Sequence, residues 1–266
     1  MRLEYEKILA APPPGDSLPG AVFFDLDETI FEFRRSSRAG LKAVVSSIPE
    51  LSALGEEMLE NRYWDLGKET LQLVRSGSLG IDRENEYRFR KLFELYGLHL
   101  ADDELKSLLR GYTSEFSKQS SLVPGTQEIL RALRESGLKV GIITNGPKET
   151  QIKTVERLGL NPLIDFMVTP EDAGTLKPDS RIFMKAIDLA GVAPENSVMV
   201  GDSWANDIIG ANRAGIRPIW FNRKGEQKPQ PDLAQSITSL WELPELMGLQ
   251  LAPVSPPRVL QNSNSC

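Results

Sequence analysis

Two carboxylates, Asp25 and Asp27, follow the apolar run Val22–Phe24 near the start of the chain. The apolar run predicts a buried strand, and side chains two residues apart in an extended segment share one face. Two like charges held this close raise each other's energy unless a cation lies between them. The segment therefore predicts a site for a hard divalent metal ion, with a carboxylate left to attack a substrate.

Three further groups downstream could serve the same chemistry. Thr144 and Asn145 end a second apolar run, where a hydroxyl and adjacent backbone N–H groups can bind a phosphoryl oxygen. Lys177 precedes a proline and can neutralise the charge of a transferring phosphoryl group. Asp202 follows a third apolar run and a glycine, and Asp207 comes five residues later. The order of these groups predicts one composite site rather than isolated surface charges.

Together these segments closely resemble the four motifs of the haloacid dehalogenase-like (HAD) phosphohydrolase superfamily. The matching stretches are 22–29, 142–146, 177–178 and 200–207. Each motif is weak alone, but all four occur in order at expected strand ends or helix starts. The resemblance spans roughly residues 19–250, nearly the whole chain apart from its two ends.

The resemblance implies roles for five of these residues. Asp25 is the candidate nucleophile, since an attacking carboxylate splits a hard displacement into two easier steps through an aspartyl phosphate. Asp27 is the candidate general acid and then general base. Thr144 is expected to bind the phosphoryl group, and Asn145 to position either that group or the nucleophile. Lys177 is expected to neutralise the charge of the phosphoryl group and of Asp25.

The resemblance also implies a Mg²⁺ site. Mg²⁺ prefers few carboxylates together with waters and the substrate phosphate. Asp25, the backbone carbonyl of Asp27 and the carboxylate of Asp202 match the family's ligands. Asp207 matches the second acid of the fourth motif, and we expect it to act through water or by holding Lys177.

Among subgroups the motifs look most like the pyrimidine 5'-nucleotidase-like and N-acylneuraminate 9-phosphatase-like members. This implies a Mg²⁺-dependent phosphatase that hydrolyses a small phosphomonoester, either a nucleoside monophosphate or a sugar phosphate. A phosphomutase of the β-phosphoglucomutase type is an alternative, as is a non-catalytic binding protein on the same scaffold. A 2-haloacid dehalogenase is a third, disfavoured by Asp27 because the family's dehalogenases lack an acid at that position.

The rest of the sequence predicts an α/β fold with a Rossmann-like parallel sheet and helices on both faces, because strand-like runs alternate with helical patterns. In such sheets ligands bind beyond the carboxyl ends of the strands. The expected strands are Ala21–Asp25, Lys139–Thr144, Asp165–Thr169, Ser197–Asp202 and Arg217–Phe221. The expected helices are Gly125–Ser136, Lys148–Leu158, Ser180–Ala190 and Trp204–Ala214.

Residues 33–120 break the alternation and are helix-like throughout. The resemblance identifies them as an inserted all-helical cap domain of the C1 type. The core domain then comprises residues 19–32 and 121–250, with a flexible leader over 1–18 and a disordered tail over 251–266. Trp204, inside the fourth motif, is expected to pack where the cap and the core meet.

Composition limits the partners and the location. The 266 residues carry a formal net charge of -6, which argues against binding a nucleic acid polymer. The single cysteine, Cys266, allows no internal disulfide. No apolar stretch approaches the roughly 20 residues of a membrane helix, and the start lacks a signal-like apolar core. We therefore expect a cytoplasmic monomer or homodimer whose partner is a small phosphorylated metabolite, not a membrane.

Overall fold

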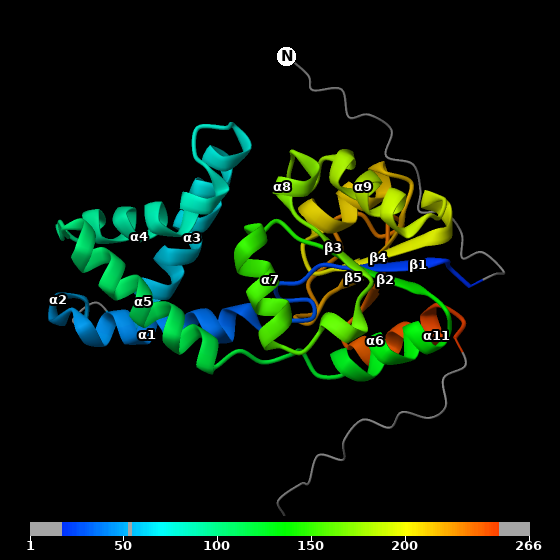
Figure 1. Ribbon diagram of the computed structural model, residues 1–266, viewed down its shortest axis with the longest axis horizontal. Helices are drawn as coiled ribbons and strands as arrows, with labels where there is room; N and C mark the ends of the chain where they lie inside the picture. Colours follow the sequence, from blue (N-terminus) through cyan, green and yellow to red (C-terminus); the bar gives the residue numbers. More distant parts are fainter. Residues whose placement is uncertain (1–17, 53–54, 250–266) are drawn as a thin grey trace, which may run out of the picture.

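The protein is a six-stranded parallel sheet with helices on both faces and a group of helices at one end (Figure 1). The computed structural model describes residues 18–52 and 55–249. The expected tail and, apart from residue 18, the expected leader lie outside the described residues. The strand order is β3-β2-β1-β4-β5-β6. The strands are β1 Ala21–Phe24, β2 Lys139–Ile143, β3 Phe166–Val168, β4 Ser197–Gly201, β5 Arg217–Phe221 and β6 Gln235–Ile237.

The two faces of β1 are buried against different helices. Val22 and Phe24 join the cluster that includes residues of α6 (Thr126–Glu135), α7 (Lys148–Arg157) and α11 (Leu243–Leu246). Ala21 and Phe23 alternate with them and join the cluster formed with α9 (Ser180–Ala190) and α10 (Ile209–Arg213). A strand covered on both faces reads as a continuous apolar run, which is why β1 and β4 stand out in the sequence.

The register of the sheet brings the polar segments to one edge. Phe24 pairs with Ile142 on β2 and with Val200 on β4. The residues that follow these three strands therefore emerge within one or two positions of each other. This edge carries the candidate site and faces the group of helices inserted after β1 (Figure 1).

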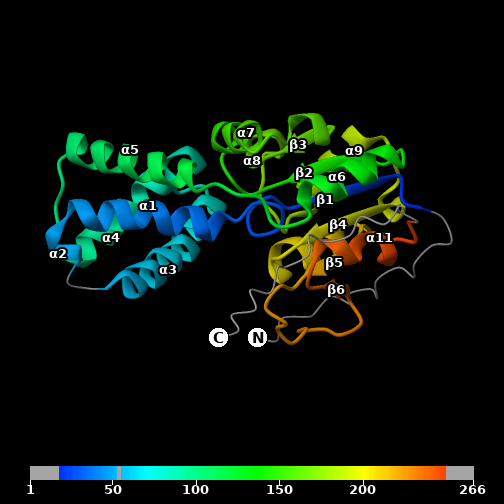
Figure 2. The ribbon, with the colours of Figure 1, turned by 90° about the horizontal axis from the view of Figure 1, so that it is seen from below.

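These helices, called the helical unit below (residues 33–118), lie between β1 and β2 in the chain and beside the sheet in space (Figures 1 and 2). The buried aromatic rings of Tyr63, Phe89 and Tyr112 pack against one another with centroids 5.0–6.3 Å apart. The helices are α1 Phe33–Ser47, α2 Pro49–Ser52, α3 Glu56–Arg75, α4 Glu84–Leu95 and α5 Asp102–Lys118, with a 3-10 turn η1 at Ile81–Arg83.

The predicted fold class is confirmed, with differences in detail. The short strand β6 is absent from the prediction because two of its three residues, Gln235 and Ser236, are exposed and polar. The helix expected over 204–214 begins as a π-helical turn, η4 (Trp204–Ile208), before α10 continues it. Three other short elements connect the strands: α8 Pro170–Ala173, η2 Asn161–Leu163 and η3 Pro194–Asn196; η5 Leu240–Glu242 precedes α11.

The expectation for Trp204 is wrong. Its ring packs edge-on against Trp220 of β5, with centroids 5.0 Å apart, in a cluster that includes Leu233 and Ala234. This cluster lies inside the sheet domain, because η4 folds back over β5. The contact of η4 with the helical unit is made instead by Asn206, whose Oδ1 accepts a hydrogen bond from Arg75 of α3 at 2.7 Å. Among the described helices, none combines the length and apolar content required to cross a membrane.

Candidate active site

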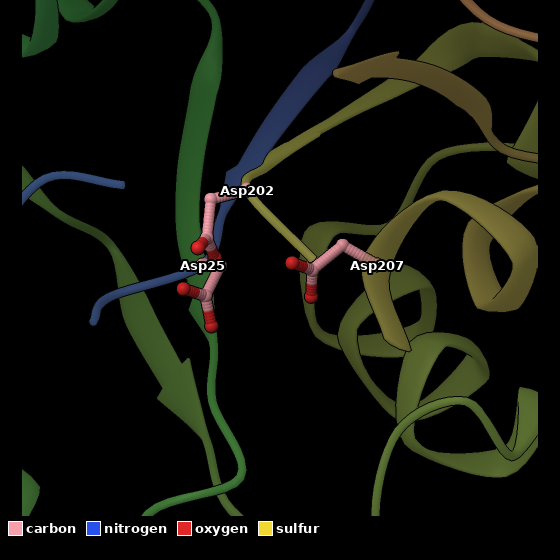
Figure 3. Close-up of side chains that lie close together, drawn as sticks. All are labelled: Asp25, Asp202 and Asp207. Carbon is pink, nitrogen blue, oxygen red and sulfur yellow. The ribbon is translucent and has the colours of Figure 1, made fainter. Parts of the chain in front are cut away.

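Three carboxylates meet at the carboxyl edge of the sheet (Figure 3). Asp25 follows β1, Asp202 follows β4, and Asp207 lies in η4. One oxygen of each lies within 4.8 Å of the others. Figure 3 shows Asp25 and Asp202 close together, with Asp207 facing them from the other side. The strand register, and not closeness in sequence, assembles this cluster.

Lys177 is buried among these carboxylates. Its Nζ donates to Asp25 Oδ1 at 2.5 Å, to Asp207 Oδ1 at 2.7 Å and to the carbonyl of Ile143 at 2.7 Å. All three ammonium donors are thereby used. Burial lowers the pKa of Lys177, but Asp207 and Asp25 outweigh burial and raise the pKa above its usual value. Lys177 therefore stays charged although its side chain is only 2% exposed.

Asn145 fixes the main chain of Lys177. The backbone N–H of Lys177 donates to Asn145 Oδ1 at 2.7 Å, and Asn145 Nδ2 donates to the Lys177 carbonyl at 3.1 Å. The next bond, Lys177–Pro178, is a cis peptide. Both polar groups of the Asn145 side chain are thus engaged in holding Lys177 in place.

Asp25 is buried and anchored on both oxygens. Thr29 Oγ1 donates to Asp25 Oδ2 at 3.3 Å and in turn accepts the N–H of Asp202 at 3.1 Å. Burial raises the pKa of Asp25 to about 7, against the opposing charge of Lys177. The local structure therefore raises the energy of the ionised carboxylate, a condition that a nearby cation would relieve.

Asp27 has a different environment, set by Gln151 on α7. Gln151 Nε2 donates to Asp27 Oδ2 at 2.9 Å and to Thr144 Oγ1 at 2.9 Å. The second oxygen, Asp27 Oδ1, is buried and has no hydrogen-bond partner among residues 18–52 and 55–249. Burial raises the pKa of Asp27 to about 6. The two oxygens of Asp27 are therefore unlike, because Gln151 holds Oδ2 and Oδ1 is left without a partner among the described residues.

Gln151 is a site residue that the sequence prediction missed. It lies one helical turn into α7, after the motif residues Thr144 and Asn145 that follow β2, and nothing about a glutamine at that point suggests chemistry. The glycine at position 146 is the sequence feature that could have pointed to Gln151. In any other residue at this position, the Cβ would lie 1.9 Å from Gln151 Nε2. The glycine after Asn145 is thus required for the Gln151 side chain to reach Asp27.

The side chains of Asp207 and Asp202 differ in the hydrogen bonds that they accept. Asp207 Oδ1 accepts from Lys177 and its Oδ2 accepts the N–H of Ser203 at 2.9 Å. Burial, together with the charges of Asp25 and Asp207, raises the pKa of Asp202 well above its usual value. Clustered carboxylates of this kind fit a hard divalent cation, and the side-chain oxygens of Asp202 accept no hydrogen bond from residues 18–52 and 55–249.

A cavity of about 600 Å³ opens onto these residues from the side of the helical unit. Its floor holds six of the seven predicted site residues, and the seventh, Thr144, lies fully buried beneath Gln151. The wall of the cavity opposite this floor is formed by aromatic side chains of the helical unit, namely Phe33, Tyr63, Trp64, Tyr112 and Phe116. The structure thus brings all seven predicted residues together and adds an aromatic wall opposite them.

Comparison with known proteins places this site in a family. Residues 19–215 match the haloacid dehalogenase-like hydrolase family. The ribulose-1,5-bisphosphate 5-phosphatase of Halopiger xanaduensis is 29% identical over 206 residues, which cover 77% of this chain and 86% of that protein. The pyrimidine 5'-nucleotidase YjjG of Escherichia coli is 29% identical over 228 residues, which cover 85% and 96% respectively.

Among solved structures, a 2-haloacid dehalogenase from Pseudomonas syringae pv. Tomato superposes with a TM-score of 0.64 at 28% identity, over 87% of this chain and 99% of the dehalogenase. Phosphatases and dehalogenases thus share this scaffold. The family match covers well over half of the chain and includes every motif described above. The protein therefore belongs to the haloacid dehalogenase-like hydrolases.

Proposed function

We propose that this protein is a Mg²⁺-dependent phosphatase that hydrolyses a small-molecule phosphomonoester through an aspartyl phosphate on Asp25. The observation that carries the proposal is the pair of unlike carboxylates at the end of β1. Asp25 is bound to Lys177, whereas Asp27 is bound to Gln151 and keeps a buried, unpartnered Oδ1. A nucleophile and a proton carrier placed side by side are what phosphoryl transfer from an alkoxide requires.

In the first step, a carboxylate oxygen of Asp25 attacks phosphorus and the bond from phosphorus to the leaving oxygen breaks. Asp27 gives its proton to that leaving oxygen, so the alcohol departs neutral. Lys177 offsets the negative charge at Asp25 throughout, because its ammonium group is held 2.5 Å from Oδ1.

In the second step, a water molecule attacks the phosphorus of the aspartyl phosphate. Asp27, now ionised, takes a proton from that water, and the bond from phosphorus to Asp25 breaks to give inorganic phosphate. Asp27 is then protonated again and Asp25 is free. Gln151 keeps Asp27 in place through both steps, since it donates to Oδ2 and leaves Oδ1 to exchange the proton.

Asp25, Asp202 and the backbone carbonyl of Asp27 are the groups that we assign to the metal ion. Mg²⁺ bound there would neutralise the carboxylate cluster and draw the phosphoryl oxygens toward Asp25. We assign Asp207 to holding Lys177, since its Oδ1 accepts from Lys177 Nζ and its Oδ2 accepts the N–H of Ser203.

The helical unit acts in this proposal as a cap that selects the substrate and excludes water. Its aromatic wall faces the reacting carboxylates across the cavity. A flat or apolar part of a leaving group, such as the base of a nucleoside monophosphate, would find contact there. A sugar phosphate would instead use the polar groups on the floor of the cavity.

A 2-haloacid dehalogenase is the second candidate, favoured by the superposition on the Pseudomonas enzyme. Such a reaction needs a carboxylate nucleophile but no acid to protonate a leaving halide. The placement of Asp27 and Gln151 would then have no use. Halide release from a 2-haloacid without phosphate release from any ester would favour this candidate.

The test is phosphate release from nucleoside monophosphates and sugar phosphates, measured with Mg²⁺ and again with excess chelator. We expect release that needs Mg²⁺. Absence of release from folded protein across the whole panel would contradict the proposal, and transfer of the phosphoryl group back to the sugar would instead indicate a mutase.

A further inference from the structure

Arg157, at the end of α7, has an unusual position among the basic residues around the cavity. The other lysines and arginines that line the cavity each have a carboxylate partner within 4.0 Å: Arg34 with Glu28, Lys68 with Asp65, Arg88 with Glu84, Lys153 with Glu149, and Lys177 with Asp25 and Asp207. Arg157 also lines the cavity, where its guanidinium carbon lies 5.9 Å from the centroid of the Phe116 ring, but it forms no ion pair with any described residue. It therefore offers a cation whose charge is not balanced locally.

The hydrogen bonds of Arg157 all go to hydroxyl groups. Nε donates to Ser120 Oγ at 3.2 Å, one terminal nitrogen to Ser117 Oγ at 3.3 Å, and the other to Thr154 Oγ1 at 3.2 Å. The guanidinium group carries five donors in a planar fork, so donors remain for another acceptor. These contacts fix the guanidinium group without neutralising it.

Ser117 adds a second donor to the same place. The hydroxyls of Ser120 and Thr154 donate to the backbone carbonyls of Phe116 and Thr150, each at 3.0 Å. The Ser117 hydroxyl donates to no group in the described part of the chain, and Ser117 lines the cavity. A guanidinium group and a free hydroxyl together fit one anionic oxygen group.

The positions of Gln151 and Arg157 on α7 give the distance between Arg157 and the reacting carboxylates. Gln151 contacts Asp27, and Arg157 lies six residues further along the same helix, with Thr154 between them. At about 1.5 Å of rise per residue, the two ends of this row are roughly 9 Å apart along the helix axis. Gln151, Thr154 and Arg157 all line the cavity, so one elongated molecule could reach both ends.

We propose that Arg157 and Ser117 form a second anion-binding subsite, which holds a carboxylate or a second phosphate at the far end of the phosphomonoester substrate. This inference rests on the proposed phosphatase activity and names the substrate class: small molecules with two anionic ends. Although Arg157 is exposed, partial desolvation lowers its pKa below the usual value, which agrees with a cation that a bound anion would stabilise.

The experiment uses three substrate series of graded chain length: alkanediol bisphosphates, ω-phosphooxy carboxylates and ω-phosphooxy alcohols. For the wild-type protein with Mg²⁺, we expect kcat/KM at the best length to be at least about tenfold higher for anionic ends than for the alcohol. The bisphosphate and carboxylate series then show which anion is preferred. An equal kcat/KM for the three end groups at every length would overturn the subsite, while phosphate release itself would still support the phosphatase.

Two variants separate an anion site from a structural brace between α5 and α7. Arg157→Ala should raise KM for the anionic-ended substrates and leave the alcohols unchanged, and Ser117→Ala should do the same to a smaller degree. Arg131→Ala, an exposed arginine on α6, serves as the matched control. If Arg157→Ala slows all three series equally, or lowers kcat and not affinity, Arg157 is a brace. If Arg157→Ala does not fold, Arg157→Gln is measured in its place. The dependence of the wild-type kcat/KM on chain length and end group then decides whether the anion site exists.

Discussion

The carboxyl edge of the sheet and the helical unit meet at one cavity but are built in opposite ways. At the sheet edge, charged groups are buried and nearly every one is bound by another residue, as Lys177 is by Asp25 and Asp207. In the helical unit the wall consists of aromatic rings contributed by separate helices, such as Tyr63 from α3 and Tyr112 from α5. The first arrangement permits little variation in chemistry, whereas the second can change shape and selectivity by exchange of single side chains.

This contrast leads to different expectations for substitutions. Changes at the sheet edge should affect the rate for every substrate alike. Changes in the helical unit should alter affinity, selectivity or stability and leave the chemical step intact. The four predictions below test that division, beginning with the largest effect.

Asp25→Asn should lower kcat by at least about a thousandfold, because an amide cannot form the aspartyl phosphate. The side chain keeps its shape, so the fold should persist. Steady-state phosphate release gives the rate and a thermal melt gives the control. Activity within tenfold of the wild type, for any substrate of the panel, would remove Asp25 from the role of nucleophile.

Asp202→Asn should reduce the rate by about a hundredfold at saturating substrate and shift the Mg²⁺ response to higher concentrations. The physical reason is the loss of one anionic ligand from the cluster with Asp25. A titration of activity against Mg²⁺ measures both effects. An unchanged Mg²⁺ response would show that the ion binds elsewhere.

Gln151→Leu should reduce kcat by about tenfold with little change in KM, since it releases Asp27 and Thr144 together. Gly146→Ala should act in the same direction, because its Cβ would occupy the place of the Gln151 amide. The matched control is Thr150→Ala, one residue earlier on α7. A rise in KM alone would indicate that Gln151 binds substrate and does not position Asp27.

Gly40→Ala should destabilise the helical unit by about 1–3 kcal/mol, because a Cβ at this position of α1 would lie 2.6 Å from the Tyr112 ring. Gly111→Ala on α5 is the matched control, since nothing lies within 4 Å of its Cβ, and it should be neutral or stabilising. Chemical denaturation measures both. Equal effects of the two substitutions would mean that α1 and α5 can separate without cost at this contact.

Several residues of the sheet edge could be predicted because they come directly after apolar runs, whereas Lys177 and Asp207 were predicted from the motifs that contain them. Asp25, Asn145 and Asp202 each follow a buried strand, so a pattern in the chain places them at one edge. Gln151 and Arg157 could not be found this way, because their contacts arise from the packing of α7 against the sheet and against α5. Trp204 was misplaced for the same reason, since only the fold shows that η4 turns back over β5.

Asp25 is proposed to carry the phosphoryl group during turnover, and rapid acid quenching would detect the group there. Wild-type protein would be mixed with excess phosphomonoester and Mg²⁺, quenched within one turnover, and mapped by peptide mass spectrometry. We expect a phosphoryl adduct that survives the acid quench on the peptide that contains Asp25. The adduct should be absent when chelator replaces Mg²⁺ and absent in Asp25→Asn. Phosphate release without any adduct, or an adduct on a different residue, would contradict the proposal.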